Sequence, residues 1–281
     1  MQIVLSKYAG FCEGVERAYR IAQEAASREK TIYILGDLVH NRDVVKHFEK
    51  LGAVKIKSFK KLKRGSTLVI TAHGSSPEIF ESASKLGLHI VDTTCPWVKK
   101  AQRIAREFSL EERQVVIVGD PGHPEVVGLR SWAGENSAVV EGPDQIQKLK
   151  LGDKVGVLAQ TTQSEENFKE VVSALRSKAG DLKIGDTICA ATSKRQCSAV
   201  DLAHMVDLVL VIGDSKSANT KRLTQLTREE GVRTHQIQNE RELESAWLKN
   251  VKAVGITAGA STPDWVIKNV VKKIKRYAEK K

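Results

Sequence analysis

The sequence has few of the features that mark several common classes of protein. It contains four cysteines in 281 residues and no Cys-x-x-Cys pair, which excludes a disulfide scaffold and disfavours zinc-finger and thioredoxin-type sites. No apolar run approaches the roughly 20 residues that are needed to span a bilayer. Met1 to Leu5 lack the basic segment and cleavage site of a signal peptide, so the protein is predicted to be cytoplasmic. The sequence has no nucleotide-binding motif, because neither GxGxxG after a strand nor a P-loop is present. A redox reaction in this protein is therefore expected to take its electrons from a separate protein.

The balance of charge is basic. Lys and Arg total 45 against 34 Asp and Glu, a net charge of +11 that favours an anionic substrate, an acidic partner or nucleic acid. Aromatic residues make up only 5%, and they are not interleaved at the strand ends, which disfavours nucleic-acid binding. The basic excess lies in two clusters: Lys55, Lys57, Lys60, Lys61, Lys63 and Arg64, and Lys268, Lys272, Lys273, Lys275, Arg276, Lys280 and Lys281. Both clusters are expected to be mainly solvated surface.

Short apolar runs alternate with amphipathic stretches along the chain. Strands are predicted at 32–35, 67–71, 115–119, 155–159, 208–213 and 253–257, where the nearly continuous apolar residues are typical of strands buried on both faces. Helices are predicted at 14–26, 96–108, 165–175, 217–230 and 263–275. Repeated strand–loop–helix units indicate an α/β protein with one or more parallel sheets, in which ligands bind at the carboxyl ends of the strands.

Three cysteines share one local context. Cys12 lies in GFCEG, Cys95 in DTTCP and Cys189 in DTICAAT, and each precedes a predicted helix, whose positive end favours the metal-binding thiolate. The helix predicted after Cys189 runs through Arg195 and Val200. Iron–sulfur clusters normally have four Cys ligands, so three separated thiolates suit a cluster that keeps one iron open to substrate. Three buried cysteines that act as small apolar residues would fit the spacing equally well. Cys197 lies inside the helix after Cys189 and is expected to be a packed or idle thiol.

Histidines and hydroxyl groups recur where predicted strands end. His40, His73 and His123 each follow a strand-like run and precede a helix, an arrangement that suits phosphate. Further donors recur in QTT (160–162), SANT (217–220) and AGASTP (258–263). Each of these alone is expected to be a helix N-cap, but together they predict a pocket rich in hydrogen-bond donors. The histidines without such a context are expected to be ordinary surface or core residues: His47, His89, His204 and His235.

Taken together, these motifs resemble one family of enzymes. GFCEGV, LVHN, TAHG, DTTCP, GHPEVVG, QTT, TICAATSKRQ and TAGASTP follow the order of the 4-hydroxy-3-methylbut-2-enyl diphosphate reductase family and extend over residues 9–263. The resemblance implies three pseudo-symmetric α/β units with parallel sheets around a central iron–sulfur cluster. We expect these units at 14–97, 98–192 and 193–281, with 1–13 contributing the first cluster ligand.

The resemblance also implies a role for each site residue. Cys12, Cys95 and Cys189 would bind a [4Fe–4S] cluster with one open iron. A diphosphate would be held by His40, His73, His123, Ser217, Asn219 and Ser261. Thr161 and Glu125 would lie beside the substrate hydroxyl as binding and catalytic residues. The family usually has a second Ser between the first Ser and the Asn, whereas this sequence has Ala218, which leaves only a backbone N–H for binding.

The implied reaction is the reductive removal of a hydroxyl group from (E)-4-hydroxy-3-methylbut-2-enyl diphosphate, which gives isopentenyl and dimethylallyl diphosphate in the last step of the non-mevalonate pathway. Glu125 would supply the proton that lets hydroxide leave as water, directly or through Thr161. A ferredoxin or flavodoxin would deliver electrons, and the basic cluster from Lys55 to Arg64 is the expected docking surface. The alternatives are a Cys/His metal-dependent hydrolase acting on a phosphorylated small molecule, and a nucleic-acid-binding protein.

Overall fold

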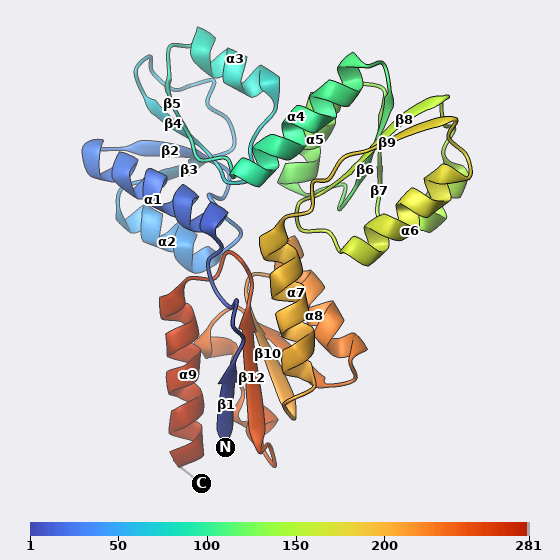
Figure 1. Cartoon of the computed structure of the whole chain (residues 1–281). Helices are drawn as coiled ribbons and strands as arrows, with labels where there is room; N and C mark the ends of the chain where they lie inside the picture. Colours follow the sequence, from blue (N-terminus) through green and yellow to red (C-terminus); the bar gives the residue numbers. More distant parts are fainter. Residues whose placement is uncertain (280–281) are drawn as a thin grey trace. The chain divides into compact units, whose positions relative to one another are not determined.

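The computed structural model describes residues 1–279, which form three four-stranded parallel sheets with helices (Figure 1). The structure therefore confirms the predicted α/β class. The chain divides into two compact bodies. The terminal body comprises residues 1–16, 39–46 and those from 190 onward, and the central body comprises residues 17–38 and 47–189. Within the described residues, none of the helices is long and apolar enough to cross a membrane.

One sheet of the central body has the spatial order β3–β2–β4–β5. Its strands are β2 (Ile32–Leu35), β3 (Val54–Ile56), β4 (Thr67–Ile70) and β5 (His89–Asp92). Helix α3 (Pro77–Lys85) packs on this sheet through Ala83, which shares a core cluster with Leu68 and Ile70. Helices α1 (Glu13–Arg28) and α2 (Arg42–Lys50) meet where the rings of Tyr19 and Phe48 lie with their centroids 5.3 Å apart.

The other sheet of the central body has the order β7–β6–β8–β9. Its strands are β6 (Gln114–Val118), β7 (Ser137–Val140), β8 (Lys154–Ala159) and β9 (Asp181–Ile184). Helices α4 (Pro96–Leu110) and α5 (Pro124–Ala133) share a core with Val115 and Ile117. Helix α6 (Glu165–Arg176) and the 3-10 helix η1 (Pro143–Lys148) share another with Val116 and Val118. Alternate residues of β6 therefore enter two cores, which explains why the strand is continuously apolar from Val115 to Val118.

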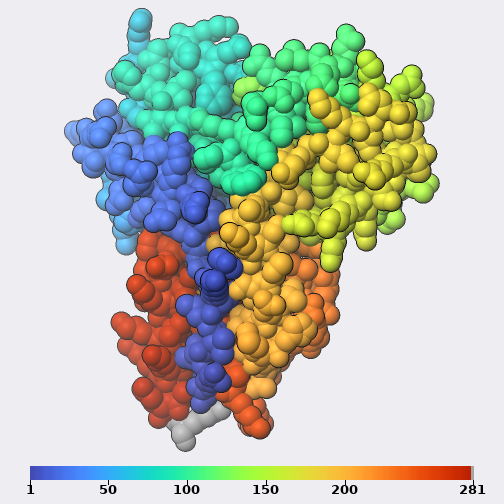
Figure 2. All heavy atoms as spheres, in the orientation of Figure 1, coloured from blue at the N-terminus to red at the C-terminus, as the bar shows by residue number. Residues whose placement is uncertain are grey.

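The sheet of the terminal body has the order β1–β12–β10–β11. Its strands are β1 (Gln2–Leu5), β10 (Leu208–Ile212), β11 (Arg233–Ile237) and β12 (Ala253–Ala258), and two 3-10 helices, η2 (Glu240–Glu242) and η3 (Ser245–Leu248), follow β11. Helix α9 (Asp264–Glu279) packs against Leu210, whereas α7 (Ala190–Ala203) and α8 (Ala218–Glu229) pack against Val211. Strand β1, dark blue in Figure 2, lies at the surface beside α9 in red.

All three sheets repeat one topology. In β3–β2–β4–β5 and β7–β6–β8–β9 the first strand in sequence lies second, and the third and fourth follow it in order. The terminal sheet, read as β11–β10–β12–β1, has the same arrangement with β1 in the place of the fourth strand. The N-terminal strand thus completes a sheet that otherwise comes from the last part of the chain. The unit boundaries at 14–97, 98–192 and 193–281 stay a prediction.

The predicted strands are the two inner strands of each sheet: β2, β4, β6, β8, β10 and β12, with ends that differ by one residue at most. The sequence pattern missed the outer strands β3, β5, β7, β9 and β11. The reason is burial. Inner strands such as β4 and β10 are buried at every residue, whereas β3 and β9 each have one half-buried residue and are otherwise exposed. A search for continuous apolar runs therefore favours strands that are largely covered on both faces.

Candidate functional site

Loops that follow equivalent strands carry equivalent residues. Strands β2, β6 and β10 each run into a Gly-Asp pair that begins at Gly36, Gly119 or Gly213. Four residues beyond these glycines stand His40, His123 and Ser217, for which phosphate binding is predicted. The internal repeat of the fold is therefore also a repeat of candidate ligand residues.

The cysteines occupy one position of this repeat. Cys95, Cys189 and Cys12 follow the fourth strands β5, β9 and β1, and each immediately precedes a helix, as predicted. Their backbone N–H groups donate to the carbonyl oxygens of Ala72, Thr161 and Ala260 at 3.0, 3.0 and 3.2 Å, respectively. These acceptors lie in the loops after the third strands β4, β8 and β12. The same backbone contact thus fixes each of the three cysteines beside the neighbouring loop.

The residues that follow these three acceptors are His73, Thr162 and Ser261. His73 and Ser261 are predicted diphosphate ligands, and Thr162 occupies the equivalent position of the repeat in the third sheet. The Oγ1 atom of Thr162 is buried and has no hydrogen-bond partner within residues 1–279. Thr162 is therefore a candidate site residue that the sequence reasoning included in QTT but did not select.

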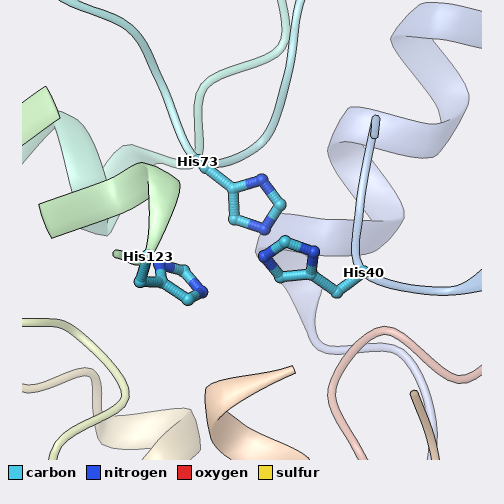
Figure 3. A group of neighbouring side chains, drawn as sticks. All are labelled: His40, His73 and His123. Atoms are coloured by element: carbon cyan, nitrogen blue, oxygen red, sulfur yellow. The ribbon is translucent and has the colours of Figure 1, made fainter. Parts of the chain in front are cut away.

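His73 and His123 lie together in the central body (Figure 3). Their ring centroids are 5.4 Å apart and the ring planes meet at 84°. His123 caps α5, because its Nδ1 accepts a hydrogen bond from the N–H of Glu125 at 3.2 Å. In a neutral imidazole the accepting nitrogen carries no hydrogen, so Nε2 of His123 carries it and can donate to an anion. Figure 3 also draws His40, which belongs to the terminal body.

The loop that carries His73 is held by side chains of α4 and α5. The carbonyl oxygen of Ser75 accepts hydrogen bonds from Nε1 of Trp132 at 2.9 Å and from Nε2 of Gln102 at 3.4 Å. Gly74 has a φ of +76°, and a Cβ at this position would lie 2.4 Å from Nε2 of Gln102. Only glycine fits both the conformation and the space, so the backbone directly after His73 is fixed.

Glu125 and Thr161 form a buried polar contact of the candidate site. Glu125 is 3% exposed, near the start of α5, and Thr161 follows β8. The backbone N–H of Thr161 donates to Oε1 of Glu125 at 2.6 Å, and the Thr161 hydroxyl donates to Oε2 at 3.0 Å. Both residues are predicted to lie beside the substrate hydroxyl, and the structure brings their polar groups into direct contact.

Burial and hydrogen bonding act on Glu125 in opposite directions. Desolvation disfavours the charged carboxylate and raises the pKa of Glu125, and the negative charge of Asp120 adds to this effect. The two hydrogen bonds from Thr161 lower the pKa, but burial dominates and the pKa of Glu125 rises from its ordinary 4.5 to about 7. A substantial fraction of Glu125 is therefore protonated near neutral pH, which is the state that a general acid requires.

Ser217 and Asn219 lie at the start of α8 in the terminal body. The Oγ atom of Ser217 accepts from the N–H of Thr220 at 3.3 Å, which leaves the hydroxyl hydrogen of Ser217 able to donate. Asn219 is 3% exposed, and neither polar atom of its side-chain amide has a hydrogen-bond partner among the described residues. Burial of an unsatisfied amide is costly, so this group is suited to a ligand. Ala218, between them, offers its backbone N–H at the helix N-terminus.

Ser261 has a structural contact that the sequence did not predict. Its hydroxyl donates to the carbonyl oxygen of His40 at 2.8 Å. A hydroxyl has one hydrogen, so donation from Ser261 to a diphosphate requires this group to turn away from His40. Within the terminal body, Arg42 also connects the segment after His40 to the loop after β10, because its Nε lies 3.7 Å from Oδ2 of Asp214.

The thiols fit the iron–sulfur cluster that the resemblance implies. Cys12, Cys95 and Cys189 are half-buried thiols in equivalent loops, one for each sheet, and Cys95 is itself the N-cap of α4. Soft thiolate ligands select iron–sulfur clusters, copper(I) and zinc rather than hard cations. Cys197 is exposed within α7, as expected for a thiol outside the site.

The remaining histidines have other contacts. His47 stacks on Tyr19, His235 stacks on Trp247 with a centroid distance of 4.0 Å, and His204 lies 3.2 Å from Glu230. His89 is exposed at the start of β5. These contacts agree with the prediction that the four are ordinary surface or core residues.

The basic cluster from Lys55 to Arg64 is exposed, as expected. In the second cluster Lys273 differs from a solvated residue, because its Nζ donates to the carbonyl oxygens of Glu240 and Leu243 at 2.6 and 3.0 Å. Lys280 and Lys281 lie outside the described residues.

Some of these features had signals in the sequence. The Gly-Asp-x-x-(His/Ser) pattern occurs at Gly36, Gly119 and Gly213, and Asp-Thr precedes both Cys95 and Cys189 by three residues. A search for internal repeats would have found them. The hydrogen bond from Ser261 to His40 spans 221 residues and had no such signal.

The comparisons with known proteins agree over nearly the whole chain. The sequence matches the LytB protein family over residues 3–275. It is 42% identical to a 4-hydroxy-3-methylbut-2-enyl diphosphate reductase from Geobacter sp., over 98% of this chain and 97% of that protein. It is 45% identical to the enzyme of the same name from Pelobacter propionicus, over 98% of both chains.

Two solved structures share the fold. The E-1-hydroxy-2-methyl-but-2-enyl-4-diphosphate reductase from Plasmodium falciparum has a TM-score of 0.92 at 31% identity, over 96% of this chain and 87% of that one. A second reductase, described as the terminal enzyme of the non-mevalonate pathway, has a TM-score of 0.72 at 38% identity, over 98% of this chain and all of that one. The identity, the coverage and the repeated fold lead to one conclusion: this chain belongs to the LytB protein family.

Proposed function

We propose that the protein catalyses the reductive removal of the hydroxyl group of (E)-4-hydroxy-3-methylbut-2-enyl diphosphate, with isopentenyl and dimethylallyl diphosphate as products. This is the terminal reaction of the non-mevalonate pathway, and relatives at 42% and 45% identity over nearly their full length carry the name of this reductase. The structural observation that carries the proposal is the threefold repeat, which places one cysteine after the fourth strand of every sheet.

Cys12, Cys95 and Cys189 would hold a [4Fe–4S] cluster. When bound by three protein thiolates, such a cluster supplies electrons and one iron that is open as a Lewis acid. The proposal is supported by the equivalence of the three cysteines. Each directly precedes a helix, and the backbone N–H of each makes the same type of hydrogen bond to the loop after the third strand of its sheet. The three α/β units, at 14–97, 98–192 and 193–281 with 1–13 joining the last, would surround this cluster.

The diphosphate would be bound by the donors at strand ends and helix N-termini. From the central body these are His73 and His123, and from the terminal body they are His40, Ser217, the N–H of Ala218, Asn219 and Ser261. Hydrogen bonds to an ionised phosphate are roughly twice as strong as neutral ones, so they fix the end of the substrate that does not react. Binding energy at that end then orients the hydroxyl end for reaction.

Glu125 and Thr161 would deliver the proton that converts the leaving hydroxide into water. When Glu125 is protonated, its Oε2 can donate to Oγ1 of Thr161 across the observed 3.0 Å. The Thr161 hydroxyl is then released to donate its own hydrogen to the substrate oxygen. A pKa of about 7 for Glu125 suits this relay, because the acid is available near neutral pH and its loss of a proton is not strongly uphill.

The electrons would come from a ferredoxin or a flavodoxin. Such donors are usually acidic, and the exposed basic cluster from Lys55 to Arg64 is the proposed docking surface. A cytoplasmic location fits a pathway whose substrate, products and donor are all water-soluble.

The alternative of a metal-dependent hydrolase is not favoured by the relatives, and metal analysis separates the two functions. We expect protein purified without oxygen to be brown, with broad sulfur-to-iron absorption and about four iron and four sulfide per chain. A colourless protein that contains zinc and no sulfide would contradict the proposed reductase and support the hydrolase.

A further inference from the structure

A buried arginine of α7 contacts two segments that carry cysteines. Arg195 is only 3% exposed. Its Nη2 donates to the carbonyl oxygen of Gly10 at 2.8 Å, and its Nη1 donates to the carbonyl oxygen of Ala191 at 3.4 Å. Gly10 lies two residues before Cys12, and Ala191 lies two residues after Cys189. One guanidinium therefore connects the segment before Cys12 to the segment after Cys189.

Chain geometry limits how far this charge can lie from both cysteines. Consecutive Cα atoms are about 3.8 Å apart, so the Cα atoms of Cys12 and Cys189 each lie within about 8 Å of the Cα atom of the residue that Arg195 binds. Arginine stays protonated at physiological pH, and its planar fork can bind two acceptors at once. A buried charge acts more strongly on its neighbours than an exposed one, because less water screens it.

The contact with Gly10 depends on an unusual backbone conformation. Gly10 has a φ of +103°, and a Cβ there would lie 3.2 Å from Oδ1 of Asp264 and 3.3 Å from Cδ1 of Ile267. Glycine is therefore needed to aim this carbonyl group at Arg195. Helix α7 contacts the N-terminal segment at a second point, where the hydroxyl oxygens of Ser198 and Ser6 lie 2.8 Å apart.

We propose that Arg195 is a positioning residue for the iron–sulfur cluster. It fixes the loop of Cys12 against the helix that begins after Cys189, and it places a permanent positive charge near both thiolates. The inference rests on the proposed function, because it takes Cys12 and Cys189 as cluster ligands. Mutation of a residue that orients metal ligands typically lowers the affinity for the metal by roughly 10–100-fold. A nearby positive charge stabilises the more negative, reduced cluster and so raises its reduction potential.

The test compares Arg195→Met with Lys194→Met in full-length protein after anaerobic reconstitution. Lys194 is the preceding residue of α7 and is exposed, so its replacement removes the same charge without touching the buried contact. We expect Arg195→Met to lose iron to a chelator at least roughly tenfold faster than wild type and to show a lower midpoint potential. Lys194→Met should match wild type in both. Equal rates and potentials in the two variants would overturn the inference.

A second measurement does not need the cluster. In the apoprotein, amide hydrogen exchange at residues 9–12 should be faster in Arg195→Met than in Lys194→Met. Arg195→Lys keeps the charge but loses the fork, so it should show faster exchange with a midpoint potential near that of wild type. If Arg195→Met does not fold, Arg195→Lys is used in its place. The inference would be overturned if Arg195→Lys showed the same amide exchange and the same iron retention as wild type. Failure of wild type itself to take up iron would instead contradict the proposed function.

Discussion

At Glu125, a single carboxyl group experiences burial and hydrogen bonding with opposite effects. Its surroundings in α5 are apolar, with Val126 and Leu129 fully buried nearby in sequence, and this desolvation exceeds the stabilisation of the carboxylate by Thr161. A first-turn acid that only stabilised its own helix would be ionised and exposed. Glu125 is buried, and its raised pKa keeps a substantial fraction of it protonated near neutral pH, which favours a role as proton donor.

Replacement of Glu125 by Gln removes the acidic proton and keeps the size of the side chain. A general acid contributes roughly 10²–10⁴-fold, so turnover should fall at least about a hundredfold, with iron content unchanged. Glu135→Gln, an exposed position just beyond α5, is the control and should keep full activity. Steady-state turnover of Glu125→Gln within about threefold of wild type would show that the proton has another source.

The raised pKa of Glu125 also affects stability. The folded protein holds the proton up to about pH 7, whereas the unfolded chain releases it near 4.5. The stabilisation that this proton gives is complete below about 4.5 and is lost as the pH rises through about 7, by roughly 3 kcal/mol in the free energy of unfolding. Urea unfolding of the apoprotein, as wild type and as Glu125→Gln, measures this loss. The stability of wild type relative to the variant should decrease over this range, and a difference that is independent of pH would contradict the burial argument.

At the scale of elements, three of the loops at the end of each sheet have fixed roles. The loops after the first and third strands carry donors, and the loop after the fourth strand carries a thiol directly before a helix. This division depends on parallel strands, whose carboxyl ends all lie at one edge of a sheet. The cysteines are therefore equivalent in topology, although Cys12 and Cys95 are 83 residues apart along the chain and Cys95 and Cys189 are 94 apart.

The equivalence predicts equal effects of substitution. Changing Cys12, Cys95 or Cys189 to Ser should each remove most of the bound iron and nearly all activity, because one ligand of the cluster is lost. Cys197→Ser is the matched control within α7 and should leave iron content close to wild type. Iron analysis after anaerobic reconstitution decides the matter, and equal iron loss in all four variants would refute the assignment of three ligands.

The sequence predicts elements well where one environment acts on a whole run of residues. Inner strand β10 is buried throughout and is continuously apolar, and β6 has both properties from Val115 onward, so these strands were predicted. Edge strand β9, with the sequence DLKI, has one covered side and polar residues, so its pattern is ambiguous. The three cysteines and three of the histidines were selected from their local sequence context, whereas the roles of Glu125 and Thr161 were implied by the family resemblance. Their contacts could not be predicted, because the bond from Thr161 to Glu125 joins residues 36 apart through the packing of a strand and a helix.

At the scale of the whole molecule, the charge of +11 is unevenly distributed. The six basic residues from Lys55 to Arg64 lie in and after β3, an exposed edge strand, where they also discourage pairing with another sheet. A surface of this kind attracts an acidic protein over a distance of about 8–10 Å at physiological salt.

Reversal of Lys60, Lys61 and Lys63 to Glu tests this docking surface. We expect a raised KM for the protein donor, with turnover unchanged when a small chemical reductant supplies the electrons, because only docking depends on these charges. Reversal of Lys268, Lys272 and Lys275 on α9 gives a control with the same change in net charge and should leave the KM nearer to wild type. Parallel loss in both assays, or no change in either, would rule out the Lys55–Arg64 surface.

The central claim is that this fold removes a hydroxyl group by reduction. Its most direct test is a single assay in which anaerobically purified protein with a full complement of iron receives (E)-4-hydroxy-3-methylbut-2-enyl diphosphate and a chemical reductant, and the products are identified by mass and chromatography. We expect both isopentenyl and dimethylallyl diphosphate, with the diphosphate intact and the hydroxyl oxygen released as water. Recovery of unchanged substrate from iron-loaded protein, or release of phosphate in place of the hydroxyl group, would contradict the proposed function.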